Sequence, residues 1–86
     1  MKKLEKTLKA LANASRLKML AYLKRNANSS VEAVSEATKC SYKATSKHLG
    51  ILFQADIVER EQRGYEMQYR IALVKDAATG KLLDLI

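Results

Sequence analysis

The sequence predicts a mainly α-helical domain that carries one β-hairpin, and three observations lead to this prediction. Apolar residues recur at helical spacing through most of the first 54 positions. After residue 55 the pattern changes to an alternation of apolar and polar residues, which is typical of a half-buried strand. The chain has 86 residues and a hydrophobic content of 48%, so we expect a single globular domain over residues 1–86.

Three helices are expected in the first half of the chain. Leucines on one helical face predict a first helix over residues 3–12. Asn13 is a suitable N-cap for the second helix, which ends in a polar stretch rich in Asn and Ser. Ser29 and Glu32 have the spacing of a capping box, which predicts a short third helix from Ser29 to about Thr38.

A fourth helix, over residues 41–54, follows a tight connection at Lys39 and Cys40. Ser41 is its expected N-cap, and two helices joined in this way form a helix-turn-helix unit. No Asp or Glu occurs between Lys39 and Gln54, so the exposed face of this helix is cationic and rich in hydrogen-bond donors. Such a surface is typical of a helix that lies in the major groove of DNA. The stripe expected to be buried consists of Thr45, Leu49 and Leu52.

A hairpin and a last helix complete the predicted fold. Residues 57–62 form the first strand, and the second strand follows a tip at Gly64, which tolerates the positive φ of a tight turn. Helical spacing returns from Val74, and we expect a helix over residues 75–86. This order of elements is that of a winged helix-turn-helix, with the hairpin as the wing. The apolar face of the second strand consists of Met67, Tyr69, Ile71 and Leu73.

The exposed face of the fourth helix supplies most of the candidate DNA contacts. Its N-terminal turns are expected to enter the groove most deeply, which assigns Tyr42, Lys43 and Ser46 to base edges. Lys39, Lys43 and Lys47 are four residues apart and are assigned to phosphates, with a solvated helix face as the alternative. The net charge of +7 favours a polyanionic partner, although a basic protein without one has the same composition. The full set of candidates is Lys39, Ser41, Tyr42, Lys43, Ser46, Lys47, His48, Arg60 and Arg63.

Several candidates have more than one interpretation. Arg63 at the wing tip, with Arg60 and Arg70 behind it, is a candidate for a minor-groove or phosphate contact, although neighbouring glutamates dilute the charge. His48 is a candidate for a phosphate contact, a metal ligand or a core position. One histidine and one cysteine do not supply the three or four ligands of a zinc site. Cys40 is expected to be a small buried hydrophobe, with a redox role as the alternative, and as the one cysteine it excludes an intrachain disulfide.

Several segments resemble the ArsR/SmtB family of winged-helix repressors, in the same order and at matching spacing. Residues 8–20 resemble the family's opening motif, which reads Leu-Ala-Asp-Pro-Thr-Arg-Leu-Arg-Ile-Leu. Residues 41–52 resemble its recognition helix, Ser-x-x-x-x-Ser-x-His-Leu-x-x-Leu. Residues 55–58 resemble the Ala-Gly-Leu-Val with which its wing begins, and the pair Tyr69-Arg70 resembles the Tyr-Tyr-Arg-Leu with which the wing ends. The resemblance implies a transcriptional regulator that binds DNA through the helix over residues 41–54.

The chain departs from the family pattern at two places. Ala14 stands where the family has Pro, which costs only some rigidity at the start of the second helix. Metal-sensing members carry two cysteines on the third helix, where this chain has Ser30 and Glu32, and the C-terminal tail contains no histidine. A hydroxyl and one carboxylate make a poor site for a soft metal, so we expect neither a metal nor another cofactor.

The terminal helices, residues 3–12 and 75–86, are expected to form a dimer interface. A chain of this length has little core to spare, so their apolar side chains are expected to pack against a second copy instead of closing the monomer's own core. The recognition helices of such a two-fold dimer read an inverted repeat in double-stranded DNA, with half-sites about one helical turn apart. The candidate interface residues are Leu4, Leu8, Leu82, Leu83 and Ile86.

Other classes of protein have little support in the sequence. It contains no Ser-His-Asp arrangement in a suitable context, no Gly-rich phosphate loop and no paired-carboxylate motif, so we expect no catalytic residues and no enzyme. No apolar run approaches the roughly 20 residues of a membrane span, and no signal peptide is evident, which predicts a cytoplasmic location. The expected function is a transcriptional repressor that occludes a promoter. A winged-helix module for protein–protein contacts and an RNA-binding domain are the alternatives.

Overall fold

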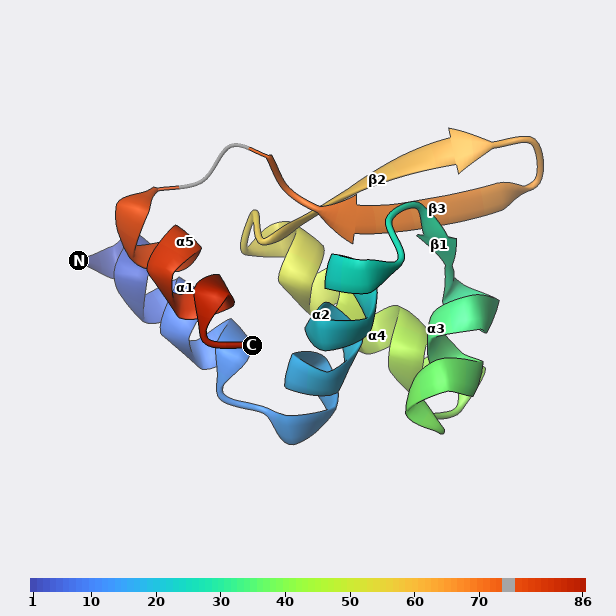
Figure 1. Ribbon diagram of the computed structural model, residues 1–86, viewed down its shortest axis with the longest axis horizontal. Helices are drawn as coiled ribbons and strands as arrows, with labels where there is room; N and C mark the ends of the chain where they lie inside the picture. The colour runs from blue at the N-terminus through green and yellow to red at the C-terminus, as the bar shows by residue number, and fades with distance from the viewer. Residues whose placement is uncertain (74–75) are drawn as a thin grey trace.

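The computed structural model of the protein describes residues 1–73 and 76–86 (Figure 1). Within them the predicted order of helices and wing strands is confirmed, and one short strand is added. Helical spacing was predicted to return at Val74, and the last helix was predicted to begin at Lys75. Both residues lie outside the described residues. The helices are α1 (Lys2–Leu11), α2 (Ala14–Arg25), α3 (Val31–Thr38), α4 (Tyr42–Gln54) and α5 (Ala77–Asp84), and the strands are β1 (Ser29–Ser30), β2 (Val58–Arg63) and β3 (Glu66–Ile71).

The strands form an antiparallel sheet in the order β1-β3-β2. The β2–β3 hairpin runs from the pair Val58–Ile71 to the pair Arg63–Glu66 and projects beyond the helices as the wing (Figure 1). Strand β1, which the sequence analysis did not predict, pairs Ser29 with Tyr69 and so joins the base of the wing to the start of α3. The cap of α3 was placed one residue too early: the Ser29 hydroxyl donates to the Asn26 carbonyl at 2.6 Å, and the capping hydroxyl is that of Ser30.

Four helices begin with a side-chain cap. The side-chain oxygen of Asn13 accepts a hydrogen bond from the Arg16 amide at 3.0 Å. The capping residue of α3 is Ser30, whose hydroxyl accepts from the Ala33 amide at 3.0 Å. Ser41 and Asp76 cap α4 and α5 in the same manner. These caps satisfy amides that have no partner within their own helix, so they set where α2, α3, α4 and α5 start.

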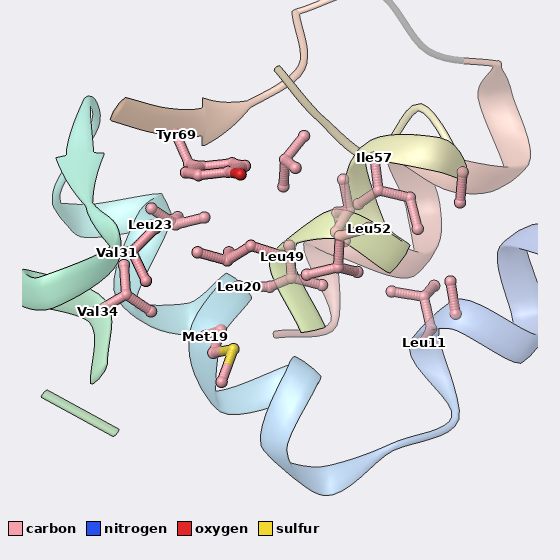
Figure 2. Close-up of a cluster of buried hydrophobic side chains, with 14 residues drawn as sticks. Leu11, Met19, Leu20, Leu23, Val31, Val34, Leu49, Leu52, Ile57 and Tyr69 are labelled. Atoms are coloured by element: carbon pink, nitrogen blue, oxygen red, sulfur yellow. The ribbon is translucent and has the colours of Figure 1, made fainter. Parts of the chain in front are cut away.

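The core lies where α2, α3 and α4 meet the base of the wing (Figure 2). Leu20 of α2 is fully buried. Leu49 and Leu52 of α4 are also fully buried, as predicted for the stripe on that helix. Tyr69 closes this core from β3, but Leu73, which was predicted on the same apolar face, is 85% exposed. The strand pattern fails there because β3 ends at Ile71. Other members of the core are Leu11, Met19, Leu23, Val31, Val34 and Ile57.

Helices α1 and α5 pack against each other at one end of the molecule (Figure 1). Leu4 and Leu8 of α1 are 38% and 45% exposed, so they point away from the protomer's own core. Leu83 is 4% exposed, which corrects its assignment to a dimer interface, because the side chain is buried within its own chain. Leu82 and Ile86 are half-buried against the same core. The Lys24 ammonium donates to the carbonyls of Leu83 at 3.1 Å and Ile86 at 2.9 Å, which ties α5 to α2.

Candidate nucleic-acid interface

The turn between α3 and α4 is built on a residue in the left-handed region. Lys39 has φ 57° and ψ 37° and ends α3, and the Cys40 amide donates back to the Ser35 carbonyl at 3.1 Å. This conformation ends α3 and turns the chain, so that the Ser41 cap of α4 follows only two residues later. Cys40 is half-buried against the core, which agrees in part with its predicted place as a small buried hydrophobe.

The outward face of α4 carries the predicted base and phosphate contacts together. Tyr42, Lys43, Ser46 and Lys47 are all exposed, and Tyr42 keeps 62% of its surface. The helix contains no acidic residue, and Lys43 and Lys47 give the N-terminal half of this face a positive potential. The Ser41 hydroxyl serves as the N-cap and accepts from the Ala44 amide at 3.1 Å, so its acceptor capacity is partly used within the helix.

His48 has a partner that the sequence analysis missed. Its Nδ1 lies 3.1 Å from the guanidinium of Arg16, which also donates to the carbonyl of Ala10 at 2.6 Å. Because a guanidinium only donates, Nδ1 must accept and the proton resides on Nε2. Burial lowers the pKa of His48 below the ordinary value of 6.5, and the nearby charges of Arg16 and Lys47 lower it further. The predicted phosphate contact of His48 stays a prediction.

The arginines of the wing are less free than their positions in the sequence suggest. The Arg60 guanidinium lies 3.9 Å from the centre of the Phe53 ring, a cation–π arrangement that holds β2 against α4. Arg63 pairs with Glu61 at 3.5 Å, and Arg70 binds Glu59 and Glu61 at 3.2 Å each. These glutamates dilute the charge of the wing, as expected, although exposed pairs of this kind stabilise the fold little.

Comparisons with known proteins show which class of protein shares this fold. A scan against models of protein families and a search of curated proteins found no match. Among solved structures, a homodimeric winged helix-turn-helix DNA-binding domain of Mb0332 from Mycobacterium bovis, described as a possible ArsR-family transcriptional regulator, is 31% identical with a TM-score of 0.84. That match covers 98% of this chain and 74% of the Mb0332 fragment.

Two further structures agree with this match. HlyU from Vibrio cholerae is 28% identical over 96% of this chain and 86% of its own, with a TM-score of 0.81. The antimony-specific transcriptional repressor AntR is 29% identical over 92% of this chain and 68% of its own, with a TM-score of 0.75. The fold is therefore that of a winged helix-turn-helix transcriptional regulator. The chain belongs to the ArsR family of these regulators.

Two observations bear on metals and membranes. Within residues 1–73 and 76–86, no three side chains of His, Cys, Asp or Glu are grouped as ligands for a metal ion. None of the described helices has the combination of length and apolar character that crossing a membrane requires.

Proposed function

We propose that the protein is a sequence-specific DNA-binding regulator and that α4 lies in the major groove of its operator. The observation that carries this proposal is the outward face of α4, where Lys43 and Lys47 are exposed on a helix without acidic residues. Tyr42 and Ser46 lie on the same face and are assigned to base edges, while Lys39 at the preceding turn is assigned to a phosphate. Arg63 at the wing is assigned to the adjacent minor groove or backbone.

We propose that the protein acts as a homodimer and represses transcription by occluding a promoter. The exposed leucines of α1 support a two-fold interface, and the Mb0332 domain is described as homodimeric. AntR, described as a repressor, supports the direction of regulation. Such a dimer would act without catalysis and would read an inverted repeat in double-stranded DNA.

Selection of bound duplexes from a random pool, followed by fluorescence-anisotropy titration at several salt concentrations, tests this function. We expect an inverted repeat to emerge and the affinity to fall with salt, with a log–log slope of about −0.9 per phosphate contacted. Lys43→Ala and Lys47→Ala should each flatten this slope by about one unit. Lys2→Ala, which removes an exposed charge from α1, is the matched control and should leave the slope unchanged.

The outcomes separate the alternatives. If both α4 variants fold and retain the original slope, α4 is not the interface. If no duplex binds even at low salt, the winged-helix protein-interaction module is the better assignment, because a DNA-binding surface of this charge must bind non-specifically under those conditions.

A further inference from the structure

A cavity of about 510 Å³ opens between α1, α2, α4 and the wing strand β2, and we call it the basic cavity. It lies beside the C-terminal half of α4, away from the base-reading positions of the first turn. No acidic side chain is among the described residues that line it. The cations of its lining are Lys6, Lys9, Arg16, Lys47 and Arg60.

Two of these cations already have partners within the fold. Arg16 donates to backbone carbonyls and to His48, and Arg60 lies over Phe53. The lysines from α1 and α4 differ, because among the residues that the structure describes no carboxylate lies within ion-pair distance of them. Like charges that share one hollow repel each other, and an anion placed among them removes that repulsion. The charge of the basic cavity is thus complementary to an anionic ligand.

The remaining lining is mainly apolar and small. Ala10, Ile51 and Ala55 contribute methyl and methylene surface, and Gly50 leaves the wall flat. A Cβ added at Gly50 would meet no atom within 4 Å, so the space beside it is open. The volume falls in the range of about 300–1,000 Å³ that is typical of small-molecule sites. A compact inorganic anion would leave this wall uncovered, whereas a carboxylate with a flat apolar body matches both the charge and the wall.

We propose that the basic cavity binds small aromatic carboxylates, with the carboxylate among the lysine ammonium groups and the ring against Gly50 and Ile51. Lys47 belongs both to this cavity and to the phosphate contacts assigned above. A bound carboxylate therefore competes with DNA for Lys47. This competition rests on the proposed function, while the binding itself does not.

Titration of 2-naphthoate into the isotopically labelled full chain, followed by amide chemical shifts, tests the binding without DNA. We expect saturable shifts at the Gly50 and Ile51 amides. Neutral 2-naphthamide, which has the same ring, should bind at least about tenfold more weakly, because charge-assisted hydrogen bonds to the ammonium groups are lost. Lys9→Gln should weaken binding of 2-naphthoate by about three- to tenfold.

Gly50 supplies a matched pair of variants. Gly50→Leu fills the cavity and should weaken binding by about tenfold or more, whereas Gly50→Ala adds one methyl group and should change it by less than about twofold. The Cβ that both residues add meets no atom within 4 Å, and both are better helix formers than glycine, so a difference between them reports on the cavity and not on the helix. Shifts that do not saturate, equal affinity for the amide, or unchanged binding to Gly50→Leu would overturn the proposal.

Addition of 2-naphthoate to the complex with a selected duplex tests the competition. We expect the apparent Kd for DNA to rise with the ligand concentration and to level off once the cavity is saturated, because one of several phosphate contacts is lost. A ternary complex with unchanged DNA affinity would overturn the competition and leave the binding site in place. A chain that binds 2-naphthoate and no duplex would contradict the proposed function alone.

Discussion

At the scale of single residues, helical and strand periodicity does not predict which residues adopt a positive φ. The sequence predicted a positive φ at Gly64, and the structure has 62° there. It also has positive φ at Asn28, Lys39 and Asp56. The family motif has Gly where Asp56 stands, so the resemblance contained a signal for that turn. Nothing in the spacing of the residues indicated the left-handed conformation of Lys39, because the usual signal for such a C-cap is Gly and this chain has Lys there.

Two glycine substitutions test the cost of these conformations. Lys39→Gly should stabilise the fold by about 1 kcal/mol and Asp56→Gly by about 0.5 kcal/mol, because glycine adopts positive φ without the clash of a Cβ and Asp tolerates it better than Lys. Chemical denaturation measures both changes. Only Lys39→Gly should also weaken DNA binding, since it removes an assigned phosphate contact. A loss of stability in both variants would show that the side chains stabilise these turns more than the backbone strains them.

The contact between His48 and Arg16 predicts a pH dependence of stability. Burial and the adjacent cations lower the pKa of His48 in the folded state, so the unfolded chain takes up the proton first as the pH falls. The stabilisation is therefore complete above about pH 6.5 and is lost as the pH falls through the lower folded-state pKa. Thermal unfolding should show a larger decrease in Tm from about pH 7.5 to about pH 5 for the native chain than for His48→Gln. Gln retains an acceptor for Arg16 and does not titrate, so equal decreases would contradict this account.

At the scale of elements, the starts of α2 and α4 were predictable from their caps, whereas the cap of α3 was placed one residue too early and the cap of α5, Asp76, was not predicted. Asn13 and Ser41 were identified from the sequence as N-caps, and both accept the expected amide. Strand β1 was missed because two residues are too few to show a period. The second wing strand was expected to be apolar through Leu73, but β3 stops at Ile71, and the chain then turns so that Ala72 is buried instead. Alternation alone does not say where a strand ends.

The cap of α5 provides a test at this scale. Asp76 accepts a hydrogen bond from the Thr79 amide at 2.8 Å, and this bond holds the pKa of the Asp76 carboxyl below its usual value. Asp76→Ala should therefore destabilise the fold through fraying of α5, because the Thr79 amide loses its acceptor. Hydrogen exchange of the α5 amides measures the fraying directly. Asp84→Ala is the control, because it removes an acid from the other end of the helix, where a negative charge is unfavourable. Equal protection of α5 in both variants would mean that Asp76 is not what fixes its start.

At the scale of the whole molecule, the face of α4 was predictable and the basic cavity was not. The absence of acidic residues over 16 consecutive positions, Lys39–Gln54, was visible in the sequence, and it defines the surface on which the proposed DNA contacts lie. The basic cavity joins cations of α1 and α2 to Lys47 of α4 and Arg60 of β2, which lie more than 30 positions further along the chain, so only the folded arrangement brings them together. The Arg16–His48 contact spans 32 residues and was hidden for the same reason.

The proposed dimer is also a property of the whole molecule, and the burial of Leu83 narrows which residues it would use. Leu83 is buried within the protomer, whereas Leu4 and Leu8 of α1 and the 83% exposed Leu85 near the C-terminus are exposed apolar residues of the terminal segments that a partner could cover. Leu8→Glu should therefore weaken dimerisation by about 100-fold, because it places an unpaired charge in the interface without disturbing the core. Sedimentation velocity measures this loss. The affinity for an inverted repeat should fall with it, since two half-sites are no longer bound together. Leu17→Glu is the matched control, because Leu17 has a similar exposure of 37% but lies on α2. A native chain that is monomeric at micromolar concentration would contradict the dimer. A Leu8→Glu variant that remains dimeric would show that Leu8 is not in the interface.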